Sequence, residues 1–304
     1  MEIADPAFRE AVDAIDTGDL NALERVIMNN PRLLHERLRE GKEGYFKDPY
    51  LLWFVSGNPV RHEKLAYNIV DITRWIIAAA KKNQVALLQH QMNYTLGLVS
   101  SGRVPRECNV QRGLIDVLVE NGADPNKGMD PAIVHRELDA IKHLLKHGAR
   151  LSLIAAIALQ KNEDIKRILP QANQQERQIA LAVAAFYGQP RTLAQLIAAG
   201  VDINAYNPDS FHSHSMPLHQ AIISGSLDSV KLLVEAGASL KARDKLYNGI
   251  PLGWALYGRP DAKIADYLRE RMALETAGRL LEAGLIKKED LEKVVQTIAK
   301  DIDA

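Results

Sequence analysis

The sequence lacks the features that would tie it to an oxidising compartment or a membrane. Its 304 residues contain a single cysteine, Cys108, so the fold cannot depend on an internal disulfide. No apolar run approaches the ~20 residues that a bilayer-spanning helix needs. The amino-terminal residues are acidic and amphipathic, whereas a signal peptide is basic and then apolar. We therefore expect a cytoplasmic protein with no signal peptide and no membrane segment.

An excess of charge of either sign is also missing. The 38 Lys and Arg residues balance the 38 Asp and Glu residues. This balance argues against a sequence-wide attraction to nucleic acid or to an anionic membrane, and we expect neither as a partner. The basic residues between 36 and 47 alternate with Glu. Such alternation indicates a solvated surface.

Catalytic motifs are absent as well. The chain has no Gly-x-Ser-x-Gly, no phosphate-binding glycine-rich loop, no His-Glu-x-x-His and no Cys-x-x-Cys. Arg106 lies close enough in sequence to Cys108 to favour a thiolate. A cysteine nucleophile also needs a His and an orienting group nearby in space, and the sequence indicates neither. We expect a protein without enzymatic activity, catalytic residues or a cofactor.

The most informative stretch that is present covers residues 216–241, MPLHQAIISGSLDSVKLLVEAGASLK. Pro217 suits the first turn of a helix, and apolar residues follow at helical spacing. Gly225 permits a tight turn, and Ser226 is placed to cap a second helix, which Gly237 ends. The spacing predicts two short helices that must pack against neighbours, because neither is long enough to be stable alone.

This stretch resembles the ankyrin repeat. MPLH stands where the family has Thr-Pro-Leu-His, Gly225 where it has the inter-helix glycine, and GASLK where it has Gly-Ala-Asp. Met216 replaces Thr and Ser239 replaces Asp, and both changes should weaken hydrogen bonding at the turns. The resemblance implies a framework role for His219, because the ring at that motif position ordinarily hydrogen-bonds between neighbouring turns.

The same unit recurs in register along the chain, which predicts an all-α ankyrin-repeat solenoid of about eight helix–turn–helix repeats. We expect a single elongated domain over residues 1–304. Its expected parts are an N-terminal capping repeat at 8–34, further repeats over 50–270, insertions near 35–49, 56–68 and 100–111, and a C-terminal helical cap at 273–304 formed by two polar helices. The repeats over 128–173 are degenerate. Most of the chain is similar to a bacterial group of ankyrin-repeat proteins that have no assigned function.

The leading functional hypothesis is a scaffold or adaptor that binds a protein or peptide partner. The resemblance implies that the first helices form a concave face and that the connections at 203–216 and 240–250 project beside it as fingers. Aromatic residues are well suited to such a surface. The predicted contact residues are Tyr206, Phe211 and Tyr247 in the connections, and Trp254 and Tyr257 on a first helix. For Trp254, packing within the stack is an equally good interpretation.

The alternative hypothesis is a small-ligand or metal site in the loop at 209–219. His212 and His214 form a His-x-His pair, and neutral His is a common Zn²⁺ ligand. Asp209 is the only carboxylate adjacent in sequence. This set falls short of a closed structural site, so we expect no bound metal and keep His212 and His214 as weak candidates.

A second aromatic group lies at 44–55 and admits two interpretations. It could anchor a partner, or it could form the small core of the insertion, and packing is the more common role of apolar side chains. We favour the core interpretation. The residues concerned are Tyr45, Phe46, Tyr50, Trp53 and Phe54.

Overall fold

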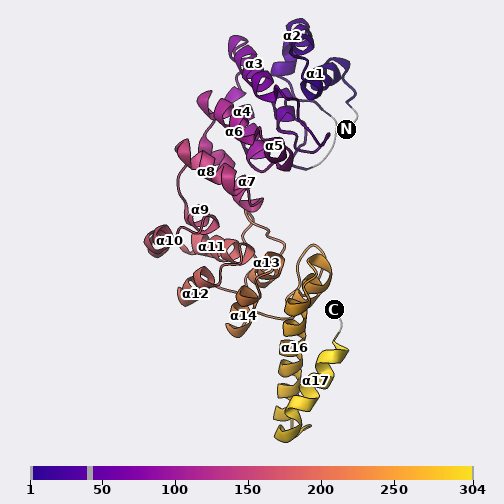
Figure 1. Cartoon of the computed structure of the whole chain (residues 1–304), viewed down its shortest axis with the longest axis vertical. Coiled ribbons are helices and arrows are strands. Elements are labelled where there is room, and N and C mark those ends of the chain that lie inside the picture. Colours follow the sequence, from indigo (N-terminus) through magenta and orange to yellow (C-terminus); the bar gives the residue numbers. More distant parts are fainter. Residues whose placement is uncertain (1–2, 40–43, 303–304) are drawn as a thin grey trace. The chain divides into compact units, whose positions relative to one another are not determined.

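The computed structural model describes residues 3–39 and 44–302, and within these ranges all regular structure is helical (Figure 1). This confirms the predicted all-α class. Residues 40–43 of the first predicted insertion lie outside the described residues. No helix in the described ranges is long and apolar enough to cross a membrane. The chain divides into two compact units, residues 1–151 and 152–304, which are described separately below.

Paired helices build the first unit. The pairs are α1 (Pro6–Thr17) with α2 (Leu20–Asn29), η2 (Leu51–Ser56) with α3 (Ile69–Lys82), α4 (Leu88–Ser100) with α6 (Gln111–Glu120), and α7 (Met129–Val134) with α8 (Leu138–Lys146). Short helices η1 (Pro31–Leu34), α5 (Arg103–Glu107) and η3 (Pro125–Gly128) lie between them. First helices pack on first helices, in the order α1, η2, α4, α7, and second helices pack in the order α3, α6, α8.

The second unit repeats this arrangement. Its first three pairs are α9 (Leu153–Ala158) with α10 (Asn162–Ile168), α11 (Gln174–Phe186) with α12 (Pro190–Ala198), and α13 (Pro217–Ser224) with α14 (Leu227–Glu235). In the last pair, α15 (Pro251–Gly253) continues into the π-helical turn η5 (Trp254–Gly258), and the two together pair with α16 (Ala262–Glu282). The short η4 (Leu169–Gln171) follows α10. The row of first helices is α9, α11, α13 and η5, and the row of second helices is α12, α14 and α16.

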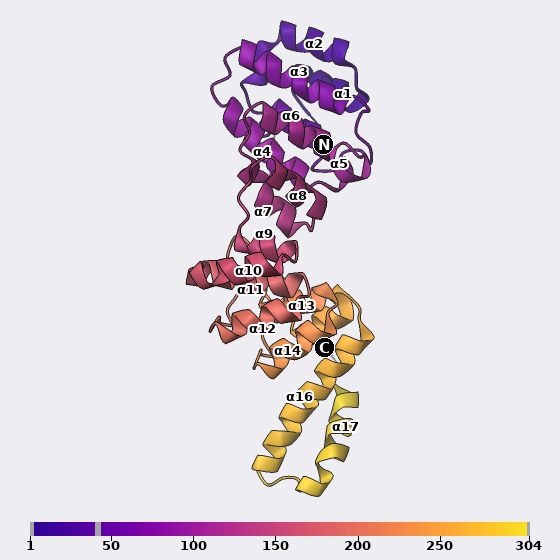
Figure 2. The same ribbon diagram turned by 60° about the vertical axis from the view of Figure 1, so that its left-hand side comes forward.

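The carboxyl-terminal cap differs from the prediction. Residues after 273 were expected to form two separate helices, but α16 runs unbroken through that position to Glu282. Neither proline nor glycine occurs from 262 to 277, so nothing in the sequence ends the helix there. After η6 (Lys288–Asp290), α17 (Leu291–Asp301) lies beside the distal half of α16, burying Ala273, Ala277 and Val295 (Figure 2). The cap is thus a hairpin that grows out of the last repeat.

Inter-helix turns use left-handed backbone even where glycine is missing. Gly188 and Gly225 have φ values of 63° and 74°, and Gln160 occupies the corresponding turn of the degenerate fifth pair with φ 55°. A non-glycine residue pays a steric cost in this region of roughly 1–2 kcal/mol. The turn geometry of the repeat is therefore kept at the expense of local strain in α9–α10.

We predict that Gln160→Gly stabilises the protein by about 0.5–1 kcal/mol, because it removes this strain and the exposed Gln160 side chain contributes little packing. Urea denaturation followed by circular dichroism measures the change. Gly200→Gln is the matched control: Gly200 has φ 75° and open space where a Cβ would lie, so it should lose about 1 kcal/mol. Destabilisation by Gln160→Gly would contradict the strain argument.

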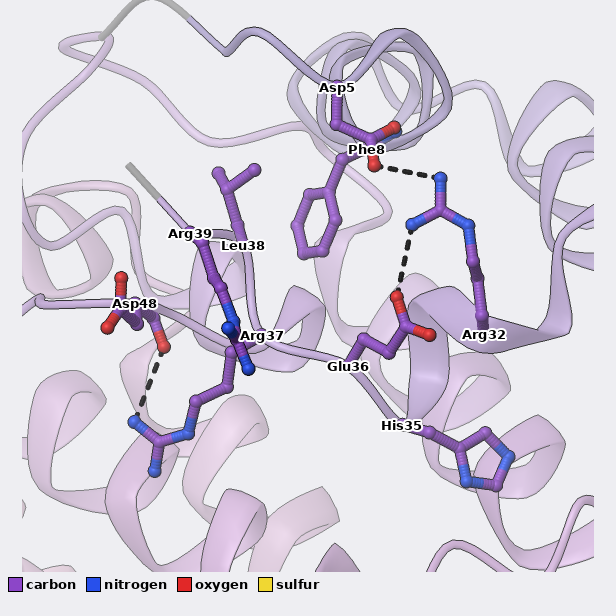
Figure 3. A pocket seen from close by; sticks show the side chains of 9 residues that line it. All are labelled: Asp5, Phe8, Arg32, His35, Glu36, Arg37, Leu38, Arg39 and Asp48. Carbon is purple, nitrogen blue, oxygen red and sulfur yellow. Dashed lines mark hydrogen bonds and ion pairs between the residues drawn. The ribbon is translucent and has the colours of Figure 1, made fainter. Parts of the chain in front are cut away.

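Two acidic side chains fix the amino-terminal helix pair. The Asp5 carboxylate accepts hydrogen bonds from the backbone N–H groups of Ala7 (3.0 Å) and Phe8 (3.1 Å), capping α1. It also pairs with Arg32 of η1 at 2.8 Å, and Arg32 reaches Glu36 at 3.2 Å (Figure 3). These contacts attach the chain leaving α2 to the start of α1.

The aromatic residues of the first insertion form a core, as the favoured interpretation predicted. Tyr50 and Trp53 are buried with Leu98 of α4, and Phe46 packs against them. Trp53 stacks on Tyr94 with ring centroids 4.0 Å apart. Tyr45 is the exception, because 58% of its surface remains exposed. The insertion therefore packs on α4.

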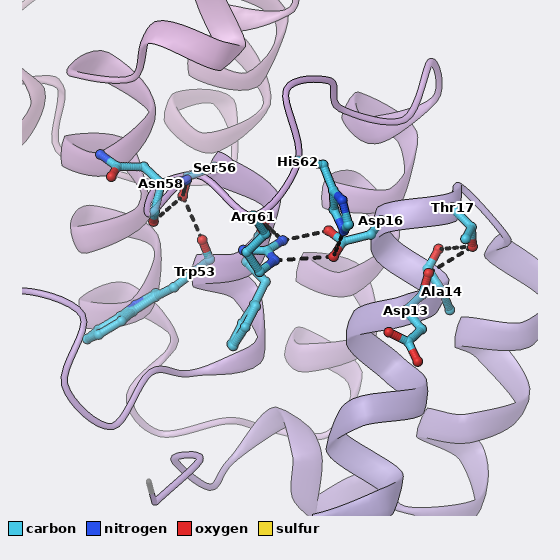
Figure 4. Close-up of polar contacts among 10 residues, drawn as sticks. Asp13, Ala14, Asp16, Thr17, Trp53, Ser56, Asn58, Arg61 and His62 are labelled. Atoms are coloured by element: carbon cyan, nitrogen blue, oxygen red, sulfur yellow. Dashed lines mark hydrogen bonds and ion pairs between the residues drawn. The ribbon is translucent and has the colours of Figure 1, made fainter. Parts of the chain in front are cut away.

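A buried ion pair holds the second insertion against α1. Arg61 donates from Nε (3.2 Å) and from a terminal nitrogen (2.6 Å) to the Asp16 carboxylate, and also donates to the Phe54 carbonyl at 3.0 Å (Figure 4). The side chains are only 10% and 12% exposed. His62 approaches the same carboxylate at 3.3 Å. Removing Arg61 would leave Asp16 largely buried without its main partner.

We predict that Arg61→Ala destabilises the protein by about 3 kcal/mol, because breaking one side of a buried pair leaves an uncompensated charge. The shift in urea midpoint, followed by circular dichroism, measures this loss. Arg74→Ala serves as control, since Arg74 and Asp71 are 55% and 65% exposed and such pairs contribute little. Equal effects of the two substitutions would show that the Asp16 pair is not special.

Candidate functional site

Three of the predicted contact residues line one pocket of about 560 Å³ in the second unit. Tyr247 lies in the connection that precedes α15, and Trp254 and Tyr257 lie on η5. Tyr247 and Tyr257 are 74% and 77% exposed, whereas Trp254 is half-buried. The other lining residues are Ile223 of α13 and the glycines Gly249, Gly253 and Gly258. The pocket is thus an aromatic hollow on the side of the first helices.

Asp244 organises the connection that carries Tyr247. Its carboxylate accepts hydrogen bonds from the backbone N–H groups of Leu246 (2.8 Å), Tyr247 (2.6 Å) and Gly249 (2.8 Å). The Trp254 indole N–H donates to the same carboxylate at 2.9 Å. Burial opposes ionisation of Asp244, but these hydrogen bonds outweigh it and lower the pKa. One ionised, buried side chain therefore shapes the loop and orients the indole.

Both interpretations of Trp254 hold in part. Its indole N–H points into the structure toward Asp244, while its ring lines the pocket. Gly249 permits this arrangement, because a Cβ there would come within 3.0 Å of an Asp244 carboxylate oxygen and 3.2 Å of the indole. The His219 ring meets the indole edge-on, with centroids 5.0 Å apart. Contacts with Asp244 and His219 thus fix the position of the Trp254 ring.

His219 has the framework role that the resemblance implied. It is fully buried; its Nδ1 accepts the Met216 N–H at 3.4 Å and its Nε2 lies 3.4 Å from the Gly249 carbonyl. Burial lowers the pKa of His219 to about 4, so the ring is neutral at neutral pH.

Phe211 does not match its predicted role, whereas partner contact by Tyr206 stays a prediction. Phe211 is only 2% exposed and packs edge-to-face on Phe186 of α11, so the expectation that it contacts a partner is wrong. Tyr206 is 37% exposed, but its hydroxyl donates to the Arg243 carbonyl at 2.7 Å and its ring lies under the Lys245 ammonium at 4.1 Å. Both residues support the connections: Phe211 anchors 203–216, and Tyr206 ties it to 240–250.

The histidine loop does not gather a metal-binding set. The rings of His212 and His214 lie 6.0 Å apart, and His214 stacks on Trp254 with centroids also 6.0 Å apart. The described residues contain one group of three His, Cys, Asp or Glu side chains whose ligand atoms lie close together, and it does not include this loop. We therefore do not carry the loop at 209–219 forward as a metal site.

That one group consists of Asp116, His143 and His147 in the first unit. The sequence analysis missed it. The available signal was the four-residue spacing of the two histidines on a predicted helix, which places both rings on one face. The third member lies a full repeat earlier in the chain, so its proximity follows only from packing of α6 on α8.

Another pocket, of about 990 Å³, lies beside α1 and includes Asp5, Arg32 and Arg37 (Figure 3). Two of its arginines already have partners: Arg32 pairs with Asp5, and Arg37 lies over the Tyr50 ring at 4.6 Å and donates to the Asp48 carbonyl at 3.4 Å. We assign it no ligand. Cys108 is similarly engaged, since its sulfur accepts the Leu65 N–H at 3.4 Å.

Two rows of short paired helices, with an aromatic pocket beside a connecting loop, define a helical repeat protein. Residues 108–244 match the family model for ankyrin repeats, described as three copies. This part of the chain therefore contains ankyrin repeats, as the resemblance indicated. Ankyrin repeats are generally protein–protein interaction modules and are typically not enzymatic. The pocket residues from Tyr247 onward lie beyond the matched region.

Similarity to other known proteins adds little. No curated protein matches the sequence. Among solved structures, the ankyrin repeat domain of human ASB11 aligns with 88% of this chain and 97% of that chain, at 15% identity and a TM-score of 0.38. A TM-score this low supports no inference about function, and the match of residues 108–244 carries the family assignment.

Because burial holds the pKa of His219 at about 4, we predict a pH-dependent loss of stability. Below the unfolded-state pKa of roughly 6.5, the unfolded chain takes up a proton that the folded ring refuses, so stability falls as pH drops from 6.5 toward 4. Between pH 7 and pH 5 the contribution is about 2 kcal/mol. His219→Gln should lack this component when urea midpoints are compared across the interval. Parallel decline of both proteins would refute the assigned protonation state.

Proposed function

We propose that this chain is a non-catalytic interaction module, a scaffold or adaptor that binds a protein or peptide partner. The contact surface comprises the side of the first helices in the second unit and the connections at 203–216 and 240–250. The observation that carries the proposal is the aromatic pocket, where the exposed Tyr247 and Tyr257 flank the half-buried Trp254.

The lining of this pocket selects an apolar side chain of the partner. Three aromatic rings and Ile223 supply contact surface, and the glycines leave room for a backbone to approach closely. Buried Trp and Tyr residues dominate the binding energy of many interfaces. The loop is also preorganised, because Asp244 fixes Tyr247 and the indole before any partner arrives, which lowers the entropic cost of binding.

Charges near the pocket add a second element of selectivity. Lys241, Arg243 and Lys245 are exposed on the connection at 240–250, while its one acidic residue, Asp244, is buried and committed to internal hydrogen bonds. The exposed face of this loop is therefore basic. A partner segment with an apolar or aromatic anchor flanked by Asp or Glu would match both features.

We predict that Tyr247→Ala with Tyr257→Ala abolishes partner binding without affecting the fold, because both side chains are mainly exposed and cover the pocket. A random peptide display library selected against the immobilised protein should enrich peptides with an apolar anchor beside acidic residues. A synthetic peptide of the enriched sequence should bind the double variant at least about tenfold more weakly. Fluorescence polarisation measures the affinity, and circular dichroism checks that the melting temperature is unchanged.

Tyr67→Ala is the matched control. Tyr67 is 92% exposed and lies outside the pocket, so its removal should leave peptide affinity unaltered. Full binding by the double variant, or enrichment of peptides that bind the first unit alone, would rule out this pocket as the recognition site.

A further inference from the structure

Asp116, His143 and His147 bring three potential metal ligands together on the second helices of the first unit. Asp116 lies on α6, His143 lies on α8, and His147 is the residue at which α8 ends. Because the two histidines are four residues apart, they project from the same face of the helix. Packing of α6 against α8 places the carboxylate opposite that face.

The three side chains converge on one point. The Nε2 atoms of His143 and His147 lie 2.6 Å and 2.7 Å from the same oxygen, Oδ1 of Asp116. All three ligand atoms lie within 4.8 Å of one another. The two rings meet edge-to-face, with centroids 5.0 Å apart. Both imidazoles thus present the same nitrogen to a single carboxylate oxygen.

This convergence suits a cation. Both nitrogens can donate to Oδ1 only if each ring carries its hydrogen on Nε2, and a metal ion takes the place of those two hydrogens. An Asp side chain is ordinarily ionised at neutral pH, so this carboxylate supplies a negative charge between the two rings. The side chains are 17%, 24% and 38% exposed for His143, His147 and Asp116, so an ion can enter from solvent.

The distances require only a small adjustment. Zinc binds imidazole nitrogen and carboxylate oxygen at about 2.0–2.2 Å, so tetrahedral coordination would separate the ligand atoms by about 3.3 Å. The observed separations from Oδ1 are 2.6 Å and 2.7 Å. Each of these two separations would have to widen by about 0.6 Å, which small side-chain rotations of Asp116 and the two histidines would supply.

We propose that Asp116, His143 and His147 form a binding site for a divalent transition-metal ion of the Zn²⁺ type, which ties α6 to α8. Two imidazoles and one carboxylate favour zinc, nickel or copper over calcium and magnesium, which prefer all-oxygen ligand sets. Three protein ligands leave one tetrahedral position for water or for a ligand from another molecule. The site is in the first unit and is independent of the proposed peptide pocket.

The test is calorimetric titration of Zn²⁺ into protein without a histidine tag, after treatment with chelator and dialysis. Wild-type protein should bind one ion per chain, and zinc should raise its melting temperature by mass action. His143→Gln with His147→Gln should abolish both effects. Asp116→Asn preserves the size and one hydrogen-bond acceptor but removes the charge, and it should bind at least about tenfold more weakly.

His212→Gln with His214→Gln is the matched control, because it removes two histidines from a loop outside the proposed site and should leave zinc binding unchanged. If His143→Gln with His147→Gln folds poorly, the zinc affinity of Asp116→Asn tests the proposal in its place. Absence of binding tighter than about 100 µM, unchanged binding by Asp116→Asn, or loss of binding in the control variant would each overturn the proposal.

Discussion

The helix pairs depend on their neighbours, because most of the individual helices are too short to be stable in water on their own. The first helix of the sixth pair shows the consequence. α11 buries seven consecutive residues, from Ala180 to Phe186, since it packs between α9 and α13. Its partner α12 buries only Thr192, Leu193 and Leu196. A helix in the inner row is thus apolar around much of its circumference, and a helix in the outer row only along a stripe.

This division decides where function can reside. Inner helices contribute little polar surface, and the contact residues that we propose accordingly lie in a connection and on η5. There the chain buries an ionised carboxylate, Asp244, and satisfies it with three backbone N–H groups and an indole. These hydrogen bonds hold the connection in place as one wall of the pocket. The outer row, by contrast, leaves side chains such as His143 partly accessible to solvent.

Local sequence signals identified the repeat reliably where they encode backbone geometry. Gly225 has the left-handed conformation that its place between two helices required, and Ser226 caps the following helix through the Ser229 N–H. The same signals misplaced the start of the cap. The last repeat passes into the cap within α16, and no proline or glycine occurs from 262 to 277 to mark the boundary. The number of repeats and the extent of the domain stay predictions, because the family model matches only residues 108–244.

The sequence by itself determined the helical class and the repeated unit, because these follow from periodicity, and its resemblance to the ankyrin motif implied the framework role of His219. Only the tertiary structure decided which aromatics are exposed: Phe211 turns inward onto Phe186, whereas Tyr247 remains at the surface. It alone paired Asp16 with Arg61, and Asp116 with His143 and His147. Such partners lie 27 to 45 residues apart in the chain and meet only when one repeat packs on the next.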